Sequence, residues 1–407
     1  MINMPKKTIM ILGAGPEQVE AIEIAKNLGL KVIAVDGNPN AQGLEIADIG
    51  IAEDIKDVNK MVEIGQEYEI DGVMTHAVEI PQIVAEVAKK LNLPGIEPEV
   101  AERATDKLKR IKCFKENGVS CANFESAKNL QEAQEKAEKI GFPCVFKPVD
   151  KAGARGVIKV NSLKEVKNAY EHALNNTDKN IILIEEYLEG KEISTESIVY
   201  NGNIYHIGIG DRNYDRKRFE PFFVQDGGQI PAKLSHELLK NLEDEIELAI
   251  KAIGINWGVA KGDYLIEADG TIRIIEMAAR TSGGRFCSIR VPLSNGINLI
   301  KLLVLISVGE EVNLDELKPK FNRYVADRFI LPEPGKIISI DGIDEARKLE
   351  GIYDIYLDNG LVIGNEIKIL TDHTCRKGQI IAVGSTYEEA VNKAEKAVKL
   401  IKINTRG

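Results

Sequence analysis

The first hundred residues alternate short apolar runs with longer stretches in which apolar residues recur every three or four positions. Short apolar runs are typical of buried β-strands, and the longer spacing is typical of amphipathic helices. Strands alternating with helices predict βαβ units and a parallel sheet. We expect strands at 8–12, 31–35, 47–51 and 72–75, and helices at about 17–28, 55–68 and 80–91.

The pattern changes after about residue 100, where hairpins and isolated helices replace the regular alternation. A helix should open near residue 105 with Thr105 as its N-cap, and residues 211–231 look like a charged, aromatic loop. Further elements are expected as strands at 141–148, 157–160 and 181–186, a hairpin over 192–209, and helices at 129–140, 162–174, 235–253 and 386–401. The changes in pattern predict three domains, at 1–100, 101–325 and 326–407.

A hairpin near residue 270 carries the most specific chemical signal. Asp269-Gly270 separates two β-rich runs, as in a two-residue hairpin turn. If those two residues alone form the loop, Asp263 lies opposite Glu276. Facing carboxylates, about 5 Å apart at Cβ, repel each other. A cation between them would turn that cost into a binding site, and Mg²⁺ suits such an oxygen-only pair. The alternative is a solvated sheet face that tolerates the repulsion.

The composition narrows the class of protein. The 407 residues carry a net charge of −10 and no long basic run, which argues against nucleic acid or an anionic membrane as the main partner. No segment approaches the length of a membrane span. The five cysteines are odd in number and form no CxxC pair, so they suit a reducing compartment better than a disulfide framework. We therefore expect a cytoplasmic protein.

Two further segments could hold a nucleotide. Lys147 ends a predicted strand and is followed by the glycine-containing loop 151–156, whose backbone NH groups could surround phosphate oxygens. The apolar strand 181–186 ends beside Tyr187-Leu188, where backbone amides and an apolar surface could flank an adenine ring, and a carboxylate a few residues further on could accept ribose hydroxyls. Taken alone, the loop also fits a simple hairpin with a surface lysine.

The order of these motifs resembles that of the ATP-grasp superfamily over essentially the whole chain. The resemblance rests on Asp106-Lys107, Phe146-Lys147-Pro148, the loop 151–156, Glu185–Glu192, Asp263 and Glu276–Arg280. It implies an α/β protein with a Rossmann-like N-terminal domain, a two-lobed ATP-grasp domain and a small C-terminal α+β domain. The C-terminal segment is similar to that of biotin carboxylase, purine-pathway members and L-amino-acid ligases.

By that resemblance, Lys107 and Lys147 would contact ATP phosphates, with Gly153 and Gly156 in a lid loop. The residues that would hold adenine and ribose are Glu185, Glu186, Tyr187, Leu188 and Glu192.

The same resemblance implies that Asp263 and Glu276 bind Mg²⁺, with Mn²⁺ as an alternative metal. Arg280, together with Lys147, would stabilise the transferred phosphoryl group, or Arg280 would only form a salt bridge within the site. Many relatives have a metal-binding Asn where this chain has Ala278, although some purine-pathway relatives share the alanine. The departure puts the number of metal ions in question.

The implied activity is that of an enzyme, a carboxylate–amine ligase that forms an amide bond through an acyl phosphate and releases ADP and phosphate. A small-molecule carboxylate could be clamped by Arg285 after its glycine pair, or by arginines 212, 216 and 218 in the segment 211–221. Glu79 either faces the amine substrate or caps the helix that follows it. A homodimer is compatible with such an enzyme.

The alternatives are a purine-pathway ribotide ligase or carboxylase, a biotin-dependent carboxylase subunit, and a nucleotide-binding regulator without turnover.

Overall fold

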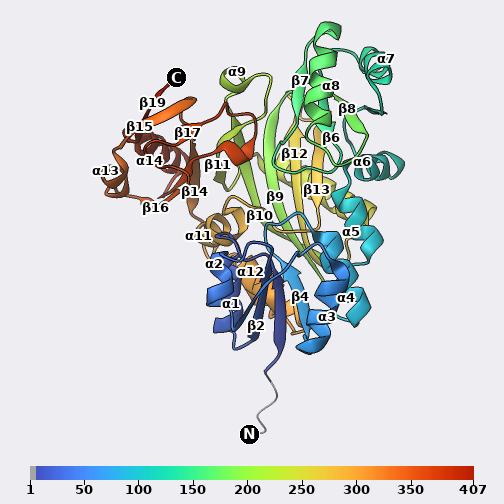
Figure 1. Cartoon of the computed structure of the whole chain (residues 1–407), viewed down its shortest axis with the longest axis vertical. Helices are drawn as coiled ribbons and strands as arrows, with labels where there is room; N and C mark the ends of the chain where they lie inside the picture. The colour runs from blue at the N-terminus through green and yellow to red at the C-terminus, as the bar shows by residue number, and fades with distance from the viewer. Residues whose placement is uncertain (1–5) are drawn as a thin grey trace.

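The N-terminal part of the chain forms the expected parallel sheet, shown in blue in Figure 1. The computed structural model describes residues 6–407, and for residues 216 and 217 it describes the backbone alone. The strands are β1 (Thr8–Leu12), β2 (Lys31–Asp36), β3 (Ile49–Ala52) and β4 (Gly72–Thr75), in the order β3-β2-β1-β4 with parallel pairing throughout. The helices are α1 (Val19–Asn27), α2 (Gln42–Ile46), α3 (Val58–Glu67) and α4 (Pro81–Leu91). All five residues of β1 are buried, as expected for a strand covered on both faces.

A small antiparallel sheet follows, with strand order β5-β8-β6-β7. Its elements and the helices before it are α5 (Pro98–Thr105), α6 (Lys107–Glu116), β5 (Phe124–Ala127), α7 (Leu130–Ile140), β6 (Cys144–Pro148), β7 (Ile158–Val160), η1 (Leu163–Glu165), α8 (Val166–Leu174) and β8 (Ile182–Glu186). The predicted N-cap was wrong by one residue. Thr105 ends α5, and the Asp106 carboxylate accepts the backbone NH groups of Leu108 and Lys109 at the start of α6.

An eight-stranded sheet, in the order β13-β12-β9-β10-β11-β14-β18-β16, runs through the centre of the molecule (Figure 1). Its first part comprises β9 (Lys191–Tyr200), β10 (Asn203–Tyr214), α9 (Arg216–Phe219), β11 (Gln225–Ile230), α10 (His236–Ile253), β12 (Gly258–Ile266) and β13 (Ile272–Ala278). The loop predicted over 211–231 was wrong at both ends, because β10 extends to Tyr214 and pairs with β11. Polar residues on these strands face a cavity, so their sequence does not read as a buried sheet.

The C-terminal segment extends the same sheet. The elements η2 (Phe286–Arg290), α11 (Val291–Asn295), α12 (Leu299–Ser307) and η3 (Leu314–Leu317) lead into it from β13. Its own elements are β14 (Tyr324–Ile330), β15 (Gly335–Asp341), α13 (Ile343–Arg347), β16 (Ile352–Leu357), β17 (Glu366–Ile367), η4 (His373–Cys375), β18 (Gly378–Gly384), α14 (Tyr387–Leu400) and β19 (Lys402–Arg406). Strands β17, β15 and β19 form a separate small sheet. Strand β14 pairs with both β11 and β18, so the central sheet continues across residue 325. The predicted domain boundaries at 100 and 325 stay predictions. No helix within residues 6–407 has the length and apolar character needed to cross a membrane.

The hairpin β12–β13 places Asp263 opposite Glu276 as predicted, but its loop and its strand register differ from those assumed in the prediction. The loop holds three residues rather than two, because Ile266 faces Ile272 and the Glu267 NH donates to the Thr271 carbonyl. Gly270, with φ of +89°, takes the left-handed position of such a loop. A bulge between Asp263 and Tyr264 then shifts the register by one residue. The longer loop and the bulge each shift the pairing by one residue in opposite directions, so Asp263 still faces Glu276.

A buried ion pair between Arg290 of η2 and Asp327 of β14 joins the middle of the chain to its C-terminal part. The two residues are only 5% and 0% exposed. We expect Arg290→Met to leave the Asp327 charge buried and unpaired, and so to lower the free energy of unfolding by roughly 3 kcal/mol in urea titrations. The control is Lys301→Met, whose half-buried pair with Glu316 should contribute less than about 1 kcal/mol. Equal losses in the two variants would contradict the prediction.

Candidate functional site

A cavity of about 990 Å³ opens at the junction of the N-terminal sheet, the central sheet and the C-terminal segment. The sequence candidates that line it are Lys107, Lys147, Gly153, Glu185, Glu186, Tyr187, Leu188, Glu192, Asp263, Glu276, Arg280 and Arg285. Gly156 does not line it. With φ of +71°, Gly156 makes a tight turn in which an added Cβ would lie 2.6 Å from side-chain atoms of Pro148 and Asn176. A close backbone approach, rather than a ligand contact, requires glycine at this position.

The predicted nucleotide residues lie on the small sheet and at the start of α6. Lys147 of β6 forms an ion pair with Glu185 of the neighbouring strand β8. The Lys107 ammonium donates to the Lys151 carbonyl and so contacts the glycine loop. Burial lowers the pKa of Lys107 to about 8, although the nearby Glu276 carboxylate raises it. The two lysines therefore bring positive charge to the same part of the cavity.

The remaining members of this group follow β8 along one wall of the cavity. The Lys159 ammonium lies 4.4 Å from the centroid of the Tyr187 ring. The Glu186 carboxylate accepts hydrogen bonds from the backbone NH and the side-chain amide of Asn123, at 2.9 and 2.8 Å. Its oxygens are thus already engaged by protein donors. The backbone NH groups of Glu186 and Tyr187 also donate, to the carbonyls of Asn123 and Pro143, so Leu188 is the position of this segment at which a base would meet the backbone.

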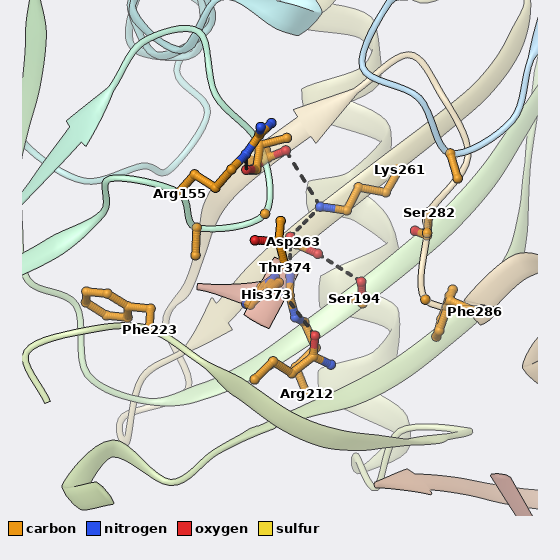
Figure 2. Close-up of a pocket in the computed structure, with 18 of the residues that line it drawn as sticks. Arg155, Ser194, Arg212, Phe223, Lys261, Asp263, Ser282, Phe286, His373 and Thr374 are labelled. Atoms are coloured by element: carbon orange, nitrogen blue, oxygen red, sulfur yellow. Dashed lines mark hydrogen bonds and ion pairs between the residues drawn. The ribbon is translucent and has the colours of Figure 1, made fainter. Parts of the chain in front are cut away.

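Asp263 and Glu276 lie on facing positions of the central sheet and are surrounded by cations. One Asp263 oxygen accepts a hydrogen bond from Ser194 at 2.8 Å, and the other pairs with Lys261 and Arg212 (Figure 2). Burial alone would raise the pKa of Asp263, but the Arg212 and Lys261 charges hold it below its ordinary value. Burial is likewise outweighed at Glu276, where cations led by Lys261 hold the pKa well below the usual range. The repulsion inferred from the sequence is therefore offset within the chain.

The chemistry of this donor set fits a magnesium ion. Asp263 and Glu276 present carboxylate oxygens to the cavity, and within residues 6–407 no third His, Cys, Asp or Glu completes a metal-ligand cluster. A hard cation that keeps several waters and takes further ligands from phosphates needs only one or two carboxylates.

Arg280 forms an ion pair with Glu79 of the N-terminal part. Glu79 does not cap the next helix, because α4 begins at Pro81 with Ile80 at its N-cap position. Arg280 therefore forms the salt bridge expected as one alternative from the sequence. Both Arg280 and Glu79 also line the cavity.

The loop after Arg280 is held from two sides. Thr281 Oγ1 lies 2.7 Å from His76 Nδ1, and the Gly284 NH donates to Glu17, so the N-terminal part fixes the loop. From the central sheet, the buried Glu196 carboxylate of β9 accepts hydrogen bonds from the NH and hydroxyl of Ser282. Burial raises the pKa of Glu196 to about 7. The loop is therefore a rigid platform in the cavity.

The candidate substrate arginines diverge in the structure. Arg285 lies with its guanidinium 3.9 Å from the centroid of the Tyr356 ring and 3.4 Å from the Gln379 side chain, both in the C-terminal segment. Arg212 lines the cavity but pairs with Asp263. Arg218 pairs with Glu333 and does not line the cavity, and the side chain of residue 216 lies outside the described part of the chain.

Sequence reasoning missed Lys261 and Arg376. Lys261 precedes Asp263 by two positions, and the two-residue period of a strand puts both side chains on the same face. Arg376 lies 3.7 Å from the Phe329 ring centroid, and burial lowers its pKa to about 9. Its only sequence signal is its place beside Cys375 in a polar stretch before β18.

Two family models match the chain. Residues 140–289 match the ATP-grasp domain, and residues 328–406 match the L-amino acid ligase C-terminal domain 2.

Among curated proteins, the formate-dependent phosphoribosylglycinamide formyltransferase of Prochlorococcus marinus is 25% identical over 412 residues, covering 98% of this chain and 97% of its own.

Solved structures share the fold. The L-amino acid ligase from Bacillus licheniformis matches with a TM-score of 0.84 and 24% identity, over the full length of both chains. The biotin carboxylase domain dimer of Hydrogenobacter thermophilus 2-oxoglutarate carboxylase, solved with MgADP and bicarbonate, matches with a TM-score of 0.74 and 20% identity, covering 98% of this chain and 90% of that one. The family matches, supported by the shared fold, identify the chain as an ATP-grasp enzyme of the carboxylate–amine ligase family.

Proposed function

We propose that this protein is an ATP-dependent ligase of the L-amino-acid-ligase type, which joins the carboxylate of one small molecule to the amine of another. The observation that carries the proposal is the cavity itself, in which the Asp263–Glu276 pair, Arg280 and side chains of the L-amino acid ligase C-terminal domain all meet. Its products would be an amide, ADP and phosphate.

In this proposal, ATP lies between the small sheet and the central sheet. The backbone of 186–188 holds adenine, Glu192 holds the ribose, and Lys107 and Lys147 contact the phosphates. The loop 151–156 covers the phosphates. Mg²⁺, when bound at Asp263 and Glu276, would neutralise phosphate charge. The Hydrogenobacter thermophilus biotin carboxylase domain, which shares this fold, was solved with MgADP.

The substrate carboxylate attacks the γ-phosphorus, giving an acyl phosphate and ADP, and the amine then displaces phosphate. Such chemistry depends on positioning and charge stabilisation rather than on a protein nucleophile. Arg280, oriented by Glu79, and Lys147 stabilise the charge that develops on the transferred phosphoryl group. Arg285 holds the carboxylate substrate from the C-terminal side. Glu17, whose carboxylate accepts the Gly284 NH, adds a negative charge to the cavity wall, which suits an ammonium group.

A purine-pathway ribotide ligase or carboxylase is the second candidate, favoured by the near full-length match to the Prochlorococcus marinus formyltransferase. A cytoplasmic location is part of the proposal, and the free thiols of all five cysteines support it. Homodimerisation is proposed from the dimer of the Hydrogenobacter thermophilus domain.

The first test concerns the products. Incubation with ATP, Mg²⁺ and pooled amino acids should release ADP and phosphate in equal amounts, because only the γ-phosphoryl group is transferred. Hydroxylamine should trap a hydroxamate of the activated acid. Release of AMP and pyrophosphate would refute the proposal, and bicarbonate dependence without an amine would favour a carboxylase.

A second test concerns the carboxylate pair. Asp263→Asn and Glu276→Gln should each lower kcat by at least about 100-fold, as expected for loss of electrostatic stabilisation. Glu267→Gln is the matched control, since Glu267 lies on the same hairpin, pairs with Arg273 and does not line the cavity. Asp263→Asn should also lower the melting temperature, because Lys261 and Arg212 lose their shared partner. Full activity of both variants would rule out the assigned metal site.

A third test concerns Arg285. Loss of a bidentate carboxylate contact in Arg285→Ala should cost about 2–3 kcal/mol, or roughly 30- to 150-fold in kcat/KM for the acid. Arg285→Lys should recover only part of this, because lysine lacks the planar fork. The KM for ATP should stay unchanged, and Arg218→Ala, outside the cavity, should have no effect. A raised KM for ATP with an unchanged KM for the acid would move Arg285 to the nucleotide site.

A further inference from the structure

Lys261 occupies an unusual place between the two carboxylates. It lies on β12 two residues before Asp263, and the strand register sets it directly opposite Ala278 of β13. Its ammonium pairs with Asp263 (Figure 2). It also lies 3.8 Å from a Glu276 oxygen. The side chain is only 9% exposed, so the ammonium is fixed at the cavity floor rather than free in solvent.

No bound ion is needed to offset the negative charges at this position. Asp263 and Glu276 contribute two negative charges, and Lys261 and Arg212 contribute two positive charges in contact with them. Arg110, Lys107 and Arg280 add further positive charge near Glu276. Both Asp263 oxygens already have partners, since one accepts from Ser194 and the other pairs with the two cations. Among the described residues, the ion-pair contact of Glu276 is the longer one of 3.8 Å with Lys261, so its oxygens remain the more accessible to a metal.

Ala278, which faces Lys261, adds to this difference between the two carboxylates. Ala278 ends in a methyl group and offers no ligand atom, while the residue across from it brings a positive charge. Phosphoryl-transfer sites use one or two divalent cations to neutralise nucleotide phosphates. An ammonium between the carboxylates supplies part of that charge and repels a second divalent ion.

We propose that the Lys261 ammonium takes the place of a second metal ion, so that the nucleotide complex of this protein holds one divalent cation, on the Glu276 side of the pair. The proposal rests on the proposed function for the presence of nucleotide, and it adds the number of ions and the residue that sets it. Lys261 then acts as a fixed cation beside the phosphates, and Arg212 keeps Asp263 neutralised.

The experiment counts bound Mn²⁺ ions in the presence of a non-hydrolysable ATP analogue, by the electron paramagnetic resonance signal of free Mn²⁺ during titration. The wild-type protein should bind one ion per chain. Lys261→Met, which keeps the length but removes the charge, should bind a second ion at least about tenfold more tightly than the wild type does. Lys261→Arg keeps the charge and should stay at one ion.

Lys191→Met is the matched control. Lys191 pairs with the buried Asp211 on the neighbouring strand β10, so the variant removes a lysine from a buried aspartate without touching the carboxylate pair. It should bind one ion. Melting curves without metal verify that each variant is folded, and Lys261→Gln replaces the methionine variant if that variant does not fold.

Two Mn²⁺ ions in the wild type, or a single ion in both the methionine and glutamine variants, would overturn the inference about Lys261. In either case nucleotide-dependent metal binding would leave the ligase proposal standing. No nucleotide-dependent Mn²⁺ binding by any variant would overturn both.

Discussion

Two carboxylates on facing strand positions in a buried site set the constraint around which the structure is arranged. Asp263 and Glu276 can remain ionised there only because opposite charges lie close to them. Those charges come from different strands, Lys261 from β12 itself and Arg212 from β10, while Ser194 of β9 hydrogen-bonds Asp263. The central sheet must therefore be fully paired before the site exists.

The segment after β13 connects the central sheet to the N-terminal and C-terminal parts of the chain. Arg280 pairs with Glu79, and the next residue contacts His76, so the loop is attached to the N-terminal sheet. Ten residues beyond Arg280, Arg290 pairs with Asp327 at the start of the C-terminal segment. One short stretch thus contacts all three parts of the chain. The cavity lies where these contacts converge, so a substrate bound there contacts side chains from distant parts of the sequence.

Local patterns in the sequence were sufficient for most elements. β1 matches its predicted range, and β9 and β10 form the hairpin expected over 192–209, with β10 running on to Tyr214. The failures have specific causes. Charged residues at 211–214 obscured the end of a strand because they face a cavity rather than an apolar core. The Asp263–Glu276 register was predicted correctly although a three-residue loop and a bulge each departed from the assumed geometry. Neither departure has a clear signature in the sequence.

The sequence by itself determined the alternation of elements, the positions of the motif residues and the presence of a carboxylate pair, because each depends on near neighbours along the chain. The tertiary structure decided which charges neutralise that pair, the partner of Arg280, and the direction of Arg285 toward Tyr356. Lys261 shows the difference most clearly. Its two-residue spacing from Asp263 is visible in the sequence, but its contact with Glu276 and its place opposite Ala278 depend on the pairing of β12 with β13. Electrostatic partners are set by distance in space, and pairing between strands fixes that distance only after the chain has folded.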